Sequence, residues 1–176
     1  MKKVIVFDIE TTGLYPEQGS RIIEIAAVPI IDEEIALEYA YESFVNPLQK
    51  IPPEITRINH ITNRMVENAQ TIDVVLPEFF NYIQDNPLVA HNALFDIGFL
   101  RYYSTSLDLE NIQNRVIDTY NLSRALFVHS KHHTLDALLK RLGIPFKSNK
   151  RHRALEDACL TARAFLALRR MLLSIQ

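Results

Sequence analysis

The sequence predicts a single α/β domain over residues 1–176, and three observations support this prediction. Residues 3–9 are almost continuously apolar and β-branched, which is typical of a strand buried on both faces of a sheet. Further along the chain, short apolar runs alternate with stretches of helical periodicity, a pattern typical of βαβ units. With 176 residues, 48% of them apolar and 23% charged, the chain is long enough to bury a core without disulfides or a structural metal.

Three strands are expected in the first part of the chain. The strand at 3–9 is followed by apolar runs at 22–31 and 36–45, and a short acidic turn separates the last two runs. Because short polar turns join antiparallel neighbours, these three strands are predicted to form a meander. Pro52 and Pro53 then open a short helical turn.

The remainder of the chain is predicted to alternate between helices and short strands. Apolar residues recur at helical spacing in each expected helix, with Pro77 as an irregularity in the first one. The expected elements are a helix over 71–84, a strand over 88–90, a helix over 93–104, a strand over 115–117, and helices over 119–127, 135–142 and 155–172.

Charge is distributed unevenly along the chain, although the net charge is only −2. Residues 1–139 hold 10 Lys and Arg against 19 Asp and Glu, net −9, whereas residues 140–176 hold 9 against 2, net +7. A uniformly basic, nucleic-acid-coating protein is therefore excluded, but a local basic segment is not.

The sequence also restricts the compartment. The single cysteine, Cys159, excludes a disulfide framework and fits a reducing environment. No apolar run approaches the ~18 residues of a membrane span, and the first apolar run ends in acidic residues, unlike a signal peptide. We therefore expect a soluble, cytoplasmic protein that does not contact a membrane.

Two carboxylates stand at the end of the first predicted strand. Asp8 and Glu10 are two positions apart, so both side chains leave the same face of the sheet, roughly 7 Å apart. Like charges at a buried strand end require a cation or a bound proton. The alternative is a strand end that water solvates.

Two further carboxylates are expected at the same edge of the sheet. Asp96 follows the strand at 88–90, where the chain passes into a helix, and Asp157 lies in the first turns of the final helix. Each is also compatible with an ordinary acidic residue at a helix N-terminus. If the strands at 3–9 and 88–90 are parallel neighbours in a mixed sheet, Asp96 lies beside Asp8 and Glu10. The final helix could then bring Asp157 to them.

Four carboxylates in one place predict a site for two divalent cations. Their combined charge of about −4 matches two such ions, and oxygen ligands favour Mg²⁺ or Mn²⁺ over zinc. A pair of metal ions suits in-line phosphoryl displacement, because it stabilises both the attacking and the leaving oxygen. Phosphodiester hydrolysis is therefore the predicted chemistry.

Three motifs, FDIETTGL (7–14), HNALFD (91–96) and HRALED (152–157), occur in this order. Together they resemble the DnaQ-like, DEDDh-type 3′→5′ exonucleases, a family that includes the proofreading epsilon subunit of bacterial DNA polymerase III. The resemblance covers about residues 3–170. It implies a ribonuclease-H-like mixed five-stranded sheet of order 3-2-1-4-5, with strand two antiparallel, flanked by helices.

The resemblance also implies roles for the carboxylates. Asp8 would bridge two metal ions, Glu10 and Asp157 would complete one site, and Asp96 would hold the second ion largely through water.

His152 is the predicted general base. Five helical residues turn through about 500°, so His152 and Asp157 can serve one site only if His152 precedes the helix. A neutral imidazole can accept a proton from the attacking water near pH 7. The other reading of His152 is a surface histidine, and that reading is preferred for His129, His132 and His133.

Lysine and arginine residues surround His152 in the sequence. Lys147, Lys150, Arg151 and Arg153 are predicted to contact substrate phosphates, because local cations offset the repulsion of a carboxylate-rich site. The alternative is a solvated loop.

Further substrate-binding residues follow from the resemblance. It assigns Leu14 to a position between the last two bases, and Thr11 and Thr12 to the terminal nucleotide. Glu54 and the segment 58–62 match the part of the family that contacts the terminal sugar and base.

This chain departs from the family pattern in that last segment. The family often has His-Gly-Ile-Thr there, whereas this chain has Asn59 and His60, so either residue could contact the base. Phe95 is expected to pack rather than stack, and Asn92 and Asp118 are expected to cap or brace loops.

The sequence therefore predicts a metal-dependent 3′→5′ exonuclease acting on the 3′ end of single-stranded DNA, of the proofreading or repair type. A 3′→5′ exoribonuclease acting on small RNA is an alternative, because contacts that distinguish the sugar are not visible in a sequence. A non-catalytic nucleic-acid-binding module is disfavoured, because all five catalytic positions are intact. Proofreading requires a DNA polymerase catalytic subunit as partner. No long tail of the kind by which epsilon holds its polymerase is expected, which leaves a free-standing enzyme and an excised polymerase domain both open.

Overall fold

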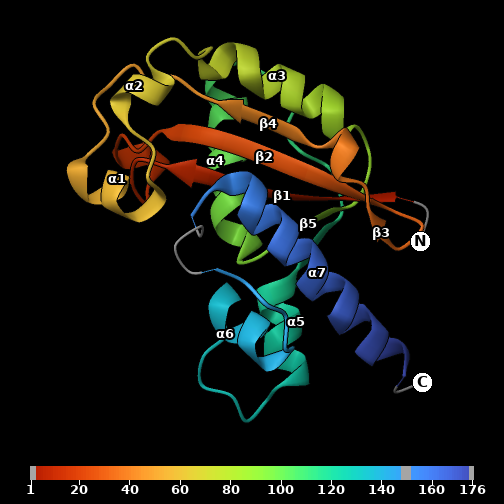
Figure 1. The fold of residues 1–176 in the computed structure, drawn as a ribbon. Coiled ribbons are helices and arrows are strands. Elements are labelled where there is room, and N and C mark those ends of the chain that lie inside the picture. The colour runs from red at the N-terminus through yellow and green to blue at the C-terminus, as the bar shows by residue number, and fades with distance from the viewer. Residues whose placement is uncertain (1–2, 148–151, 175–176) are drawn as a thin grey trace.

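A mixed six-stranded sheet forms the middle of the structure, a computed structural model that describes residues 3–147 and 152–174 (Figure 1). Its strands are β1 (Lys3–Thr11), β2 (Ile22–Ile31), β3 (Glu34–Ile35), β4 (Tyr41–Phe44), β5 (Leu88–Ala90) and β6 (Val116–Asp118). The order is β3-β2-β1-β5-β6, and β4 also pairs with β2. Strand β2 is antiparallel to β1, whereas β5 and β6 run parallel to it. The predicted ribonuclease-H-like sheet is confirmed, with one difference.

The predicted third strand over 36–45 is wrong as a single strand. Strands β3 and β4 take its place, with a 3₁₀ turn at Leu37–Tyr39 between them. Pro29 of β2 explains the interruption, because its carbonyl accepts from the Ala36 N–H at 3.0 Å and therefore faces the outer strand. The Pro29 nitrogen faces the same way and has no hydrogen to donate, so a continuous ladder cannot form there.

The predicted helices are confirmed, and one short helix was not expected. The helices are α1 (Pro53–Asn59), α2 (Asn63–Val66), α3 (Ile72–Ile83), α4 (Ala93–Ser106), α5 (Thr119–Leu126), α6 (Leu135–Arg141) and α7 (Ala154–Leu173), and a further 3₁₀ turn covers Pro16–Gln18. Helix α2 is too short to show a period in the sequence. Among the described residues, no helix is long and apolar enough to cross a membrane.

The two faces of β1 belong to different cores. Ile5, Phe7 and Ile9 pack against α3 and α4, while Val4 and Val6 pack against α7, which crosses the other face of the sheet (Figure 1). Helix α6 packs on α7 in turn. Because side chains alternate along a strand, the row that begins with Val4 and Val6 continues into Asp8 and Glu10, on the face that α7 covers.

Candidate active site

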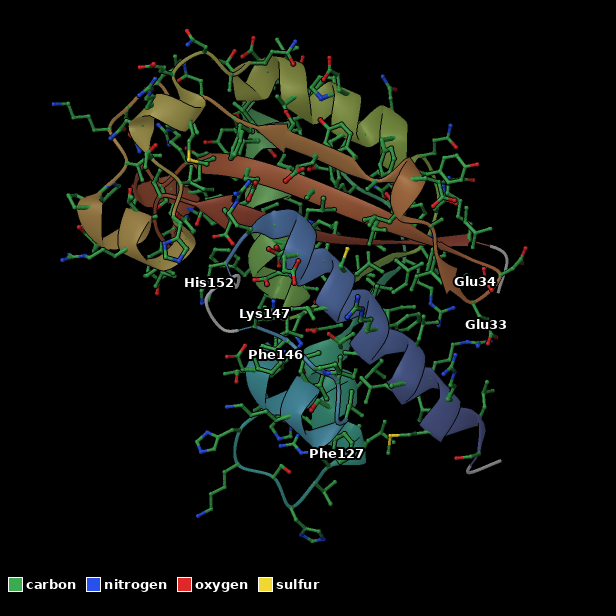
Figure 2. The ribbon with its side chains drawn as sticks, in the orientation of Figure 1. Glu33, Glu34, Phe127, Phe146, Lys147 and His152 are labelled. Atoms are coloured by element: carbon green, nitrogen blue, oxygen red, sulfur yellow. The ribbon has the colours of Figure 1, made fainter. Side chains whose placement is uncertain are left out.

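The end of β1 and the start of α7 bring three of the predicted catalytic residues together. One ligand atom from each of Glu10, His152 and Asp157 lies within 4.8 Å of the other two. His152 precedes the first helical residue, Ala154, as the helical geometry predicted, and its φ of 66° is left-handed. Its backbone N–H donates to the Asp157 carboxylate at 3.2 Å. Figure 2 shows His152 beside the start of α7, on its N-terminal side.

Asp96 reaches the same strand end from the opposite face of the sheet. It lies in the first turn of α4, is 3% exposed, and accepts a hydrogen bond from the Ile9 N–H at 3.2 Å. Burial, with a smaller contribution from Asp118, raises the pKa of Asp96 to about 8. An ionised Asp96 therefore requires a nearby cation.

These residues fit a divalent cation. Asp157 is 5% exposed, Asp8 and Glu10 are half-buried, and Asp96 is buried, so a positive ion would offset a large desolvation cost. Carboxylate oxygens are the ligands that Mg²⁺ and Mn²⁺ prefer. Asp8 and Asp96 lie outside the group of three ligand atoms defined above, although Asp8 shares the strand face of Glu10.

A part-buried ion pair holds the start of α7, and the sequence analysis missed it. Glu24 of β2 is fully buried, and its carboxylate accepts three hydrogen bonds from the Arg153 guanidinium, at 2.6, 3.1 and 3.2 Å. It also accepts from the Ala154 N–H at 2.8 Å. The Arg153 side chain is 33% exposed, and its guanidinium is held by Glu24, so its predicted contact with substrate phosphate stays a prediction. The available signal was a single glutamate within an otherwise apolar strand.

Asn59 and His60 have different positions. Asn59 is 1% exposed, and its side-chain amide donates to Glu10 at 3.3 Å and accepts from the Ile61 N–H at 3.1 Å. His60 is exposed and ends α1 in the left-handed conformation, with φ of 61°. The left-handed position explains the glycine of the family pattern, since glycine adopts positive φ without strain. In the described structure Asn59 is thus a brace for Glu10.

The other predicted substrate-binding residues differ in their exposure and in their hydrogen bonds. Leu14 is 66% exposed, and Glu54 is exposed on the first turn of α1. The Thr11 hydroxyl donates to the Gly13 carbonyl, and the Thr12 hydroxyl accepts from the Arg21 N–H, so both stabilise the turn after β1. Figure 2 shows Lys147, which is exposed, whereas Lys150 and Arg151 lie outside the described residues.

The expected loop braces are present. The Asp118 carboxylate caps α5 through the Tyr120 N–H and also accepts from the Asn92 N–H, both at 2.9 Å. Phe95 packs on the core, as predicted. The expectation of a surface position holds for His129 and His132 but is wrong for His133, which is half-buried and hydrogen-bonded to Ser123 at 2.9 Å.

Comparison with known sequences identifies relatives over nearly the whole chain. A family model described as exonuclease (RNase T) matches residues 5–165. A DNA polymerase III subunit epsilon-like protein from Rhodobacter capsulatus is 42% identical over 164 residues, covering 93% of this chain and 23% of that protein. A PolC-type DNA polymerase III from Clostridium perfringens is 42% identical over 159 residues, covering 90% of this chain and 10% of the relative. The chain thus spans about a quarter or a tenth of these relatives.

The chain is also similar to solved structures of exonucleases. Exonuclease X, in complex with 5′ overhanging duplex DNA, is 30% identical, with a TM-score of 0.75 and coverage of 97% of this chain and 92% of the other. The nuclease domain of 3′hExo, a DEDDh family member bound to rAMP, is 20% identical with a TM-score of 0.83 over 98% and 92% of the two chains, and shows the shared fold. Given the match over residues 5–165 and the similarity to exonuclease X, the chain belongs to the RNase T exonuclease family.

Proposed function

We propose that residues 1–176 form a 3′→5′ exonuclease domain that releases nucleoside monophosphates from the 3′ end of single-stranded DNA. The observation that carries this proposal is the convergence of Glu10, His152 and Asp157, whose ligand atoms lie within 4.8 Å of one another. Two carboxylates beside an imidazole supply a cation site and a proton acceptor in one place, the two requirements of metal-assisted phosphodiester hydrolysis.

His152 is the general base of the proposed reaction. A water oxygen attacks the phosphorus of the terminal nucleotide, and the bond from phosphorus to the preceding 3′ oxygen breaks. That oxygen takes a proton from solvent and becomes the 3′ hydroxyl of the shortened strand. The water proton passes to the His152 ring, which is exposed and stands before α7. The hydrogen bond from its backbone to Asp157 holds this loop residue near the carboxylates, so the ring needs no large movement to reach the water.

Asp8, Glu10, Asp96 and Asp157 would hold two divalent cations, Mg²⁺ or Mn²⁺. When bound, such ions stabilise the negative charge that develops on the phosphoryl oxygens. The residues themselves position the site: Asn59 orients Glu10, and the Ile9 N–H orients Asp96. These contacts fix the carboxylates before substrate arrives, which lowers the cost of organising them.

The proposed substrate contacts surround this centre. Leu14 separates the last two bases, the turn at Thr11 and Thr12 faces the terminal nucleotide, and Glu54 faces its sugar. Because Asn59 is engaged with Glu10, His60 is the residue proposed to contact the terminal base. Lys147, Lys150 and Arg151 are proposed to bind phosphates of the strand.

A DNA polymerase catalytic subunit is the proposed protein partner. The support is the naming of relatives at 42% identity as DNA polymerase III proteins, of which this chain covers only a part. Copurification of the chain with a polymerase subunit from the same cells, measured by size-exclusion chromatography, tests this part of the proposal.

The activity is tested by digestion of 5′-labelled single-stranded DNA, duplex DNA and RNA side by side, with Mg²⁺, Mn²⁺ or a chelator. We expect a ladder of progressively shorter strands that all keep the 5′ label, formed fastest with single-stranded DNA and absent in chelator. Faster digestion of RNA would indicate the exoribonuclease alternative. Binding without cleavage under every metal condition would indicate a non-catalytic module.

A further inference from the structure

Helix α7 begins after a residue that is unusual at a helix N-terminus. Arg153 is the N-cap of α7, with an extended backbone at φ of −129° and ψ of 128°, and its side chain makes no capping hydrogen bond. Ser, Thr, Asp and Asn normally occupy this position, because their side-chain oxygens accept from the first free N–H groups of the helix. Arginine has donors only, so Arg153 cannot cap its own helix.

Glu24 of β2 supplies the acceptor that the N-cap lacks. Its carboxylate accepts from the N–H of Ala154, the first helical residue of α7, at 2.8 Å. The same buried carboxylate holds the Arg153 guanidinium through three hydrogen bonds. Hydrogen bonds between charged partners are shorter and stronger than those between neutral ones. One carboxylate therefore fastens both a side chain and the backbone at the start of α7 to the sheet.

The Arg153–Glu24 pair stands beside the proposed site. Glu24 is opposite Glu10 in the register of β1 and β2, so the two side chains are neighbours on one face of the sheet. The Arg153 guanidinium also lies 3.6 Å from the Glu42 carboxylate. Its hydrogen bonds to Glu24 raise the pKa of Arg153 above the ordinary value, and the charges of Glu42 and Glu10 add to this effect. A permanent positive charge thus lies close to three carboxylates, of which Glu10 is a proposed metal ligand.

His152 depends on this attachment more than Asp157 does. Asp157 lies inside α7, where its N–H donates to the Arg153 carbonyl at 3.0 Å and the adjacent Ala158 packs in the core. His152 precedes the helix and has a left-handed φ of 66°, a conformation that is costly for a residue other than glycine. The residue that follows it, Arg153, is fixed to β2. The ion pair therefore helps to hold the turn from which the His152 ring comes within 4.8 Å of the Glu10 and Asp157 ligand atoms.

We propose that Arg153 is a positioning residue for the general base, because its ion pair with Glu24 fixes the backbone that carries the His152 ring. This inference rests on the proposed exonuclease function. A misplaced base slows the reaction of substrate that is already bound, and a displacement of about 1 Å can cost about 10²-fold in rate. A contact between Arg153 and a substrate phosphate would instead act on binding and on its salt dependence.

The test removes the pair without leaving a buried charge. In Arg153→Met/Glu24→Gln, the new amide oxygen can still accept from the Ala154 N–H. We measure kcat and KM on single-stranded DNA with Mg²⁺, together with the salt dependence of binding. We expect kcat to fall by about 10- to 100-fold, with KM and the salt dependence unchanged. A raised KM and a salt dependence weaker by about one phosphate contact, at an unchanged kcat, would overturn the proposal and assign Arg153 to substrate binding.

A double-mutant cycle with His152→Ala shows whether the pair acts through the base. The same two substitutions, made in the His152→Ala background, should lower kcat by less than about three-fold, because the residue that they misplace is already absent. An equal fall in kcat in both backgrounds would show that the pair acts independently of His152, which would overturn the proposal.

A second arginine–glutamate pair on the same helix provides the matched control. Arg169 of α7 binds Glu33 in the turn between β2 and β3, and Figure 2 shows Glu33 at the end of the sheet away from His152. Arg169→Met/Glu33→Gln removes the same groups and should leave kcat and KM unchanged. A comparable fall in kcat in this control would mean that any loosening of α7 slows the reaction, and the specific role of Arg153 would be lost.

The outcomes distinguish the two proposals. If wild type cleaves no single-stranded DNA with Mg²⁺ or Mn²⁺, the proposed exonuclease function fails and the inference about Arg153 fails with it. If wild type is active and Arg153→Met/Glu24→Gln retains its full kcat, the exonuclease function stands and Arg153 is not a positioning residue.

Discussion

Arg153 binds the buried carboxylate of Glu24 across 129 residues of sequence, with its Nη2 2.6 Å from Oε1. The guanidinium also lies over the ring of Phe44, 5.1 Å from its centroid. This contact fastens the first residue before α7 to β2. His152 immediately precedes it and Asp157 lies one turn later, so the position of both site residues depends on a pair that does not itself enter the site.

Loss of Arg153 is expected to destabilise the protein strongly. Arg153→Met leaves the Glu24 charge buried without its partner, which costs about 3–5 kcal/mol. Glu24→Gln removes the charge and retains an oxygen that can accept from Ala154, so we expect a smaller loss, about 1–3 kcal/mol. The double variant should therefore be more stable than Arg153→Met alone in urea unfolding. An Arg153→Met variant as stable as wild type would contradict this account.

Asp96 is expected to make the metal-free protein less stable as the pH rises. Its folded-state pKa is raised to about 8, above an unfolded value of about 3.9, so the folded state binds the proton more tightly. The contribution to stability is full below the unfolded pKa and is lost as the pH rises through the folded pKa. In chelator, the melting temperature of wild type should therefore fall between about pH 4 and 8 more steeply than that of Asp96→Asn. Equal slopes for the two proteins would exclude a raised pKa at Asp96.

The variant His60→Gly tests two roles of His60 by two measurements: stability reports the backbone strain, and KM reports the contact to the terminal base. A non-glycine residue at φ of 61° is strained, so the substitution should stabilise the fold by roughly 0.4–1 kcal/mol. If His60 contacts the terminal base, KM for single-stranded DNA should rise in the same variant. Asn59→Ala is the comparison, because it removes the donor to Glu10 and should lower kcat instead. An unchanged KM in His60→Gly would remove His60 from the substrate contacts.

The predicted phosphate contacts are testable by salt dependence. Replacing Lys147, Lys150 and Arg151 together by alanine should weaken the binding of single-stranded DNA. The plot of the logarithm of the binding constant against the logarithm of salt concentration should become less steep, by the equivalent of up to about 3 phosphate contacts. The same number of charges removed at Lys140, Arg163 and Arg170, which are exposed elsewhere, is the matched control. If both triple variants show the same slope, the first three residues belong to a solvated loop.

The sequence alone predicted those structural features whose residue pattern is long or chemically unusual. The apolar runs at β1, β2 and β5 and the helical period of α7 predicted these elements within a few residues of their ends. The five-residue spacing from His152 to Asp157, with helical geometry, predicted that His152 precedes α7. These features are local, so a single stretch of chain contains the whole signal.

The remaining features depend on pairs of distant residues. The interruption between β3 and β4 follows from the direction in which the Pro29 backbone faces, which only the sheet register determines. The inward turn of Arg153 depends on Glu24, and the engagement of Asn59 depends on Glu10. No periodicity along the sequence reports such contacts.

The central claim is that His152 accepts the proton of the attacking water at a carboxylate site for divalent cations. The most direct measurement is the rate at saturating single-stranded DNA with Mg²⁺, as a function of pH, for wild type and His152→Ala. We expect the wild-type rate to rise with pH through the ordinary imidazole range, near pH 6.5. His152→Ala should be slower by about 10² to 10⁴-fold at neutral pH, should lose that rise, and should still bind metal by calorimetry. A variant within about three-fold of wild type, with the same pH profile, would contradict the claim.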